Sequence, residues 1–93
     1  MTDKIGKAMF TLDEFREAVK VGIKKVLKKK DEVTIGDDED MEDYGLDSLA
    51  GISLVLEVES YLNIDLGEFD IDEANTINLF YAKVKRVLEE YDA

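Results

Sequence analysis

The strongest structural signal in the sequence lies at residues 45–62, which read GLDSLAGISLVLEVESYL. A helix is predicted to begin at Ser48, with Asp47 as its N-cap, and to end at about residue 61 or 62. Its apolar residues fall on two faces at helical spacing, one formed by Leu54, Val55, Val58, Tyr61 and Leu62, the other by Leu49, Ile52 and Leu56. A helix that lies on a core needs only the first face. The second is predicted to be a partner surface, a wall for a bound apolar chain, or a surface packed under the preceding loop.

Two further helices are predicted on either side of this one. Residues 11–14 read TLDE, which is a capping box, and Phe10 and Phe15 stand where a hydrophobic staple places them. Apolar residues recur at helical spacing after this start. Thr76 is the expected N-cap of a last helix, which carries an apolar stripe of its own.

A short segment, residues 70–74, is predicted to form a turn or two of helix around Ile71 and Ala74. No stretch shows the sustained alternation of a strand. The expected fold is therefore all-α: a four-helix bundle of three longer helices and one short helix, with a long loop at residues 31–47 between the first two.

That loop is acidic, and it invites a test for calcium binding. An EF-hand frame begun at Asp40 places Gly45 correctly, but it puts Tyr44 at a ligand position and Gly51 where the bidentate Glu belongs. No metal site is predicted, although weak, diffuse divalent binding stays open. The apolar residues expected to anchor the loop on the core are Val33, Ile35, Met41 and Leu46.

The amino-acid composition limits the size of the fold and the reactive groups that the chain can supply. The 93 residues are 45% apolar, which suits one domain over residues 1–93 with a core at about 10–91. Cysteine, histidine, tryptophan and proline are absent, so disulfides, thiolate nucleophiles, imidazole bases and the commonest zinc ligands are absent too. The chain is therefore not expected to be an enzyme. No signal peptide or membrane span is evident, so a cytoplasmic monomer is expected.

The net charge of −11 is unevenly distributed. Residues 31–73 hold sixteen acidic residues and no Lys or Arg, whereas the flanks hold twelve basic and seven acidic residues, for a net +5. Such a centre repels nucleic acid and anionic lipid and favours encounters with basic protein surfaces. Self-repulsion also predicts that salt or magnesium raises the melting temperature. The lysines at 24, 25, 28, 29 and 30 indicate a solvated helix end, with a docking surface as the alternative.

Ser48 is the residue with the clearest chemical potential. A hydroxyl at a helix start lies beside free backbone amides that favour phosphate oxygens, so it can carry a phosphodiester with little strain. The simpler interpretation is that Ser48 only caps the helix. A role as a catalytic nucleophile is disfavoured because no histidine exists to act as its base.

The triplet Asp47-Ser48-Leu49, preceded by Tyr44-Gly45-Leu46 and followed by a long apolar helix, resembles the phosphopantetheine attachment motif of acyl carrier proteins. The resemblance extends from the first helix to Val87, and residues 76–80 are similar to the start of that family's final helix. A bare Asp-Ser-Leu is common. Its place after an acidic loop, in a strongly acidic helical chain of this length, makes the match specific.

The resemblance implies a carrier whose Ser48 receives 4'-phosphopantetheine from coenzyme A, through a phosphopantetheinyl transferase and magnesium, with Asp47 and Leu49 as the flanking motif. Acyl groups would be held as thioesters on the thiol of that arm and presented to acyl-loading and acyl-processing enzymes. The absence of cysteine is consistent with this, because the reactive sulfur belongs to the cofactor.

Departures from the family pattern narrow the expected pathway. Fatty-acid carriers usually have acidic residues where this chain has Ala50 and Ser53, although Glu57 and Glu59 remain. The expected partner surface is accordingly Leu49, Ile52, Leu56, Glu57 and Glu59, with apolar contact compensating for weaker electrostatic steering. Housekeeping fatty acid biosynthesis is put in doubt, and a specialised lipid or polyketide biosynthesis pathway is favoured. Leu66-Gly67 stands where an Ile-Pro pair is frequent, so the start of the short helix is expected to be looser.

Two alternatives to an acyl carrier remain open. An aminoacyl or peptidyl carrier uses the same serine and arm, but usually has a less acidic surface. An acidic helical interaction module or calcium-responsive module, without any covalent cofactor, explains the net charge equally well. It does not explain the apolar residues beside Ser48.

Overall fold

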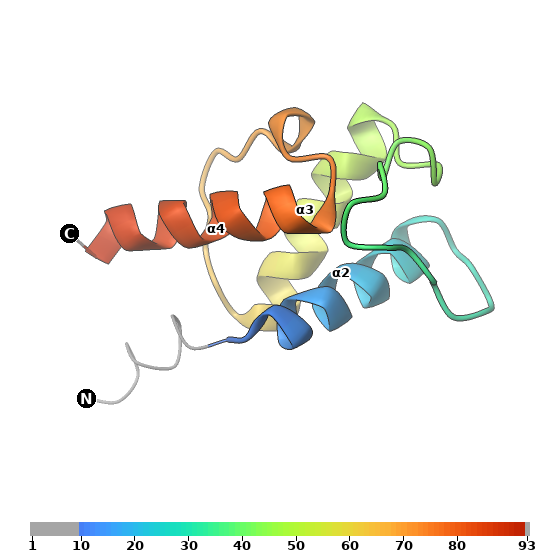
Figure 1. Cartoon of the computed structure of the whole chain (residues 1–93), viewed down its shortest axis with the longest axis horizontal. Helices are drawn as coiled ribbons and strands as arrows, with labels where there is room; N and C mark the ends of the chain where they lie inside the picture. The colour runs from blue at the N-terminus through green and yellow to red at the C-terminus, as the bar shows by residue number, and fades with distance from the viewer. Residues whose placement is uncertain (1–9, 93) are drawn as a thin grey trace.

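The computed structural model describes residues 10–92, and this part of the chain is all-helical (Figure 1). It contains three α-helices, α2 (Leu12–Val26), α3 (Ser48–Leu62) and α4 (Ile77–Asp92), together with one 3-10 helix, η1 (Ile71–Glu73). No strand occurs among the described residues. The all-α prediction is confirmed, as are the three longer helices.

The expected short helix is only η1, a three-residue 3-10 turn, so a bundle of four helices is not confirmed. The turn is closed by a hydrogen bond from the Ala74 amide to the Ile71 carbonyl at 2.9 Å. Both of these side chains are buried. Residues three apart eclipse one another in a 3-10 helix, so this tighter turn directs both side chains to the core at once.

Helix α2 begins at the predicted capping box. The Thr11 hydroxyl accepts a hydrogen bond from the Glu14 amide at 3.1 Å, and the Glu14 carboxylate accepts one from the Thr11 amide at 2.8 Å. The rings of Phe10 and Phe15 stack with their centroids 6.1 Å apart, as a hydrophobic staple requires. The helix ends before Lys28, which adopts the left-handed conformation at φ 55°.

Helix α3 begins at Ser48 and ends at Leu62, as predicted. Its core face consists of Leu54, Val55 and Val58, which are buried. Tyr61 was also expected on this face, but it is 49% exposed, so that assignment is wrong. A tyrosine at a helix end packs part of its ring while its hydroxyl stays in water.

The core lies where α2, α3 and α4 meet. Helices α2 and α3 approach closely at Gly22, where a Cβ would lie 2.7 Å from Leu54 Cδ1. Phe15 of α2 meets Phe80 of α4 edge to face, with ring centroids 5.0 Å apart. These aromatic contacts fix α4 against α2 on the side of the core that α3 leaves open.

The long loop between α2 and α3 is anchored as predicted, because Val33, Ile35, Met41 and Leu46 are all buried. The Met41 amide also donates to the Asn75 carbonyl at 2.8 Å, which ties the loop to the residues that precede α4. Because the loop is held to the core at several points, its conformation fixes the position of the residues that precede α3.

An ion pair fastens the first part of this loop to α2. Arg16 donates from Nε to Asp37 Oδ1 at 2.8 Å and from Nη2 to Asp37 Oδ2 at 2.7 Å, and it also contacts Asp13. The hydrogen bond from Arg16 lowers the pKa of the Asp37 carboxyl below its ordinary value. The Asp37 carbonyl accepts from the Asn78 amide at 3.0 Å, so this one residue links α2, the loop and α4.

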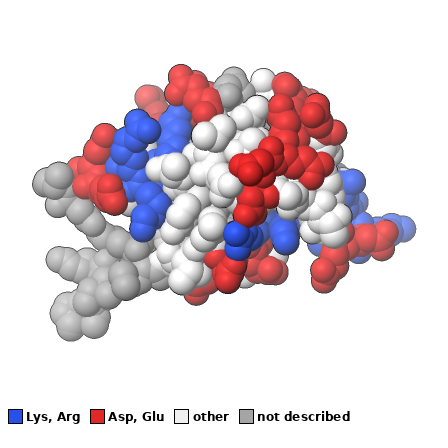
Figure 2. All heavy atoms as spheres, viewed as in Figure 1, with Lys and Arg blue, Asp and Glu red and all other residues white. Residues whose placement is uncertain are grey.

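The charged side chains are unevenly distributed over the surface. Figure 2 shows acidic side chains gathered over the loop that leads into α3. Within the cluster of lysines at the end of α2, Lys25 pairs with Glu57 of α3, with 3.6 Å between Nζ and Oε1, and Lys29 lies over the Tyr44 ring at 5.2 Å.

The described residues include no helix long and apolar enough to cross a membrane. They also include no group of three acidic side chains arranged to hold a metal ion.

Candidate functional site

Ser48 is the first residue of α3 and is exposed. The cap of the helix is Asp47, whose Oδ1 accepts a hydrogen bond from the Ala50 amide at 2.9 Å. The Ser48 hydroxyl has no hydrogen-bond partner among the described residues. The interpretation of Ser48 as the capping residue is therefore wrong, because Asp47 is the N-cap and already accepts the hydrogen bond of the Ala50 amide.

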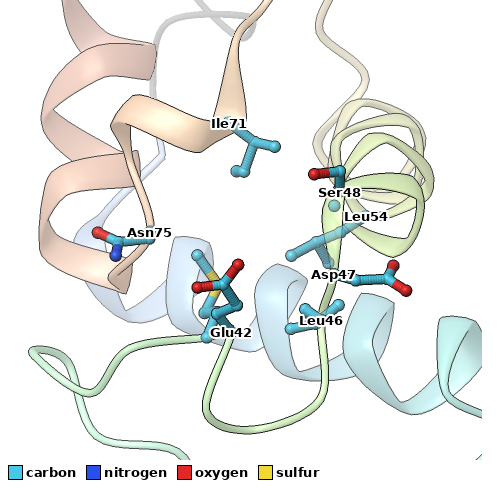
Figure 3. Close-up of a pocket in the computed structure, with 9 residues that line it drawn as sticks. Glu42, Leu46, Asp47, Ser48, Leu54, Ile71 and Asn75 are labelled. Carbon is cyan, nitrogen blue, oxygen red and sulfur yellow. The ribbon is translucent and has the colours of Figure 1, made fainter.

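A cavity of about 220 Å³ opens beside this hydroxyl (Figure 3). Its lining residues come from the loop, the first turns of α3, η1 and the segment before α4: Met41, Glu42, Leu46, Asp47, Ser48, Gly51, Leu54, Ile71 and Asn75. In Figure 3 the Ser48 hydroxyl and the Ile71 side chain point into the cavity, whereas the Asp47 carboxylate and the Asn75 amide point away from it.

A second, more open hollow of about 500 Å³ also borders Ser48 and the start of η1. It is lined by Ser48, Ile52, Glu68, Phe69, Asp70 and Ile71. Ser48 and Ile71 belong to both hollows. The serine thus lies at the junction of an inner cavity and an outer groove, and Ile71 forms the partition between them.

Gly51 makes this partition possible. A Cβ on Gly51 would lie 2.8 Å from Ile71 Cγ2, so only the glycine lets η1 lie this close to α3. Leu66, which leads into the segment before η1, is buried, and its amide donates to Glu59 Oε2 at 2.6 Å. Gly67 follows with φ 61°, a left-handed conformation that glycine adopts without cost.

The second apolar face of α3 is exposed. Leu49 is 77% exposed, Ile52 56% and Leu56 60%. Packing under the preceding loop is therefore excluded for this face. The two acidic residues expected beside it make contacts within the chain: Glu57 pairs with Lys25, and Glu59 accepts the hydrogen bond from the Leu66 amide.

The local chemistry fits a phosphodiester on Ser48. Because Asp47 caps the Ala50 amide, and the Gly51 amide donates to the Asp47 carbonyl at 2.8 Å, the amides of Ser48 and Leu49 are the ones left without a partner among the described residues. Phosphate oxygens accept from such amides, and the helix dipole favours negative charge there. The exposed hydroxyl is also accessible to a modifying enzyme.

The features beside Ser48 define a small helical protein with an exposed serine at a helix start. The model of the phosphopantetheine attachment site matches residues 17–84, and the chain belongs to this family, in agreement with the acyl carrier resemblance. Domains of this family carry a covalently attached 4'-phosphopantetheine. No curated protein and no solved structure matches the chain.

Sequence reasoning missed three residues that shape the surroundings of Ser48. Glu42 was counted only as part of an acidic run, Phe69 was not singled out, and Ile71 was expected in a short helix with no relation to the serine. No local pattern signals their roles. They reach Ser48 through the path of the loop and through the packing of η1 on α3.

Proposed function

We propose that Ser48 carries the phosphopantetheine arm and that the protein is an acyl carrier. The observation that supports this best is the free, exposed hydroxyl of Ser48 at the start of α3, inside the region that the family model matches. Asp47 and Leu49 flank it as the rest of the attachment motif. Asp47 has the further task of capping the helix, so the hydroxyl stays unbonded.

The modification needs little from the chain itself. Ser48 Oγ would attack the phosphorus of coenzyme A that bears the pantetheine, forming an Oγ–P bond and losing its proton while adenosine 3',5'-bisphosphate leaves. The amides of Ser48 and Leu49 favour the charge of the resulting phosphodiester. The arm, once attached, supplies the thiol on which cargo is held as a thioester.

For the cargo we propose acyl intermediates of a specialised lipid or polyketide pathway. The support is the surface of α3, where Ala50 and Ser53 replace acidic residues and the apolar face of Leu49, Ile52 and Leu56 is exposed. An aminoacyl or peptidyl carrier is the second candidate. The observation that favours this second candidate is the carboxylate of Glu42, which lies across the cavity from Ser48 and makes no ion pair among the described residues.

The proposed partners are a phosphopantetheinyl transferase and the enzymes that load and process the acyl group, and the chain itself is proposed to be a non-catalytic carrier. Leu49, Ile52 and Leu56 form the centre of the proposed docking surface, with Glu57 and Glu59 at its side. A single cytoplasmic domain over residues 1–93 that acts as a monomer, with η1 in place of a short third helix, completes the proposal.

The test is the intact mass after incubation with coenzyme A, magnesium and a broad-specificity phosphopantetheinyl transferase. We expect the mass of one phosphopantetheine group to be added. Ser48→Ala should gain nothing, and Ser53→Ala, which removes an exposed serine from the same helix, should gain the full group. Modification of the Ser48→Ala chain would overturn the assignment.

A further inference from the structure

The inner cavity beside Ser48 is small, and its wall is partly apolar and partly polar. Met41, Leu46, Leu54 and Ile71 form the apolar part of that wall. Its volume of about 220 Å³ compares with the roughly 150 Å³ of an engineered apolar cavity that binds benzene, so it has room for roughly six to eight non-hydrogen atoms. A longer chain would have to displace core residues, since protein interiors are close-packed.

One charged side chain, the solvent-exposed Glu42, borders this space. In Figure 3 the Glu42 carboxylate lies across the cavity from Ser48, beneath Ile71. It has no hydrogen-bond or ion-pair partner among the described residues. No Lys or Arg is among the residues that line the cavity, and the other acidic one, Asp47, caps α3 and points away.

We propose that Glu42 determines which cargo can occupy this cavity: short acyl groups whose end is uncharged or bears an amine are favoured, and groups that end in a carboxylate are excluded. This inference rests on the attachment of the arm at Ser48. The arm is flexible and fixed at the mouth of the cavity, so its far end can fold back to the opening.

The selection follows from charge and size. A short alkyl end is removed from water against Leu54 and Ile71, which is favourable in proportion to the apolar area buried. An ammonium end can pair with Glu42. A carboxylate end would meet a like charge with no cation beside it, and would lose hydration as well. An eight-carbon chain exceeds the volume.

The experiment attaches four arms to Ser48 from coenzyme A analogues in which an amide replaces the thioester, so that the cargo does not hydrolyse. The cargoes are butanoyl, 3-aminopropanoyl, 3-carboxypropanoyl and octanoyl groups. The first two have the same number of non-hydrogen atoms and differ only in the terminal methyl or ammonium group. NMR spectra of each form are compared with the form that carries the unloaded arm.

We expect the butanoyl and 3-aminopropanoyl forms to shift the methyl resonances of Leu54 and Ile71 and the amide of Gly51. The 3-aminopropanoyl form should also shift the Glu42 side chain. The 3-carboxypropanoyl and octanoyl forms should leave the cavity resonances as they are with the unloaded arm. Equal shifts in all four forms, or none in any, would overturn the inference.

Variants separate the role of Glu42 from charge in general. Glu42→Gln should let the 3-carboxypropanoyl form shift the cavity resonances, while the response to butanoyl stays unchanged. Asp43→Asn removes the same charge from the adjacent exposed residue, which does not line the cavity, and should keep the wild-type selection. If the two variants behave alike, Glu42 does not select the cargo.

The same experiment distinguishes failure of the inference from failure of the proposed function. If no arm can be attached to Ser48, the carrier proposal fails. If the arms attach and the chemical shifts of the cavity residues do not depend on the cargo, the carrier proposal stands and the selection by Glu42 is wrong.

Discussion

Asp47 caps helix α3 through a 2.9 Å hydrogen bond from the Ala50 amide, and the hydroxyl of its neighbour Ser48 is thereby left unbonded. The two adjacent residues divide two tasks that a single serine could not perform together. A serine that capped the helix would have its oxygen engaged with a backbone amide. With Asp47 in that role, the Ser48 hydroxyl is exposed beside free amides and a cavity.

The cap predicts a stability effect that depends on residue type. Asp47→Ala should lower the free energy of unfolding by about 1 kcal/mol, the usual cost of losing an N-cap. Asp47→Asn keeps an acceptor oxygen and should stay close to the wild type. Urea unfolding of the three chains measures this. Equal stability of the Ala variant would mean that the hydrogen bond to Ala50 contributes nothing.

The ion pair of Arg16 and Asp37 predicts a dependence on pH. Because the pKa of Asp37 is lowered in the folded chain, its contribution is present above the ordinary aspartate pKa of 3.8 and is lost as pH falls through the lower folded value. Asp37→Asn should therefore be less stable than the wild type at neutral pH, and this difference should shrink below pH 3.8.

The control for this prediction is Asp43→Asn, which removes an exposed carboxylate that makes no ion pair among the described residues. Its stability relative to the wild type should not show the same loss over that acidic range. Urea unfolding at a series of pH values provides the curves. A difference between wild type and Asp37→Asn that is constant with pH would contradict the role of the ion pair.

The close approach of α2 and α3 predicts that Gly22→Ala destabilises the fold. A helix interior normally gains about 1 kcal/mol from this change, but the new Cβ would lie 2.7 Å from Leu54 Cδ1. Overpacking costs about 1–3 kcal/mol, so a net loss of roughly 1 kcal/mol is expected. Gly36→Ala, whose Cβ would meet nothing closer than 3.9 Å, should be nearly neutral. A stabilised Gly22→Ala would show that the helices can separate freely.

The exposed apolar face of α3 predicts a specific effect on partner enzymes. Leu56→Ser should raise the KM of a loading enzyme roughly tenfold, which corresponds to about 1.4 kcal/mol of lost contact. Stability should hardly change, because Leu56 is 60% exposed. Leu79→Ser, on α4 and 51% exposed, is the matched control. Similar KM changes in both variants would place the docking surface elsewhere.

The acidic centre predicts stabilisation by salt. Among the sixteen acidic residues of residues 31–73, the ion pairs in the described part of the chain involve Asp37, Glu57 and Glu73, so most of the sixteen have no ion pair there. Screening should raise the melting temperature, and 1 kcal/mol corresponds to about 4–8 °C for a domain of this size. Thermal scans at rising sodium chloride measure it. An unchanged melting temperature would mean that the acids repel one another too weakly to matter.

The helices could be predicted because their signals are local. The capping box at Thr11, the cap at Asp47 and the cap at Thr76 each lie within three residues of the amide they bind. Burial of Met41 and Leu46 also followed from the sequence, since apolar residues in a polar loop have few other places to go.

The surroundings of Ser48 could not be predicted in the same way. The contact of Gly51 with Ile71 joins residues twenty positions apart, and it depends on how η1 packs on α3. The sequence places Glu59 on the surface of α3, but the left-handed turn at Asn63 lets the Leu66 amide donate a hydrogen bond to its carboxylate. Helical spacing describes one helix at a time, so it does not reveal which residues meet across a cavity.

The carrier proposal is tested most directly by locating the added group. The wild-type chain is modified with coenzyme A by a panel of phosphopantetheinyl transferases, digested, and fragmented in the mass spectrometer. We predict a single phosphopantetheine on Ser48, with Ser53 and Ser60 unmodified. A group on another residue, or a folded chain that no transferase modifies, would contradict the account.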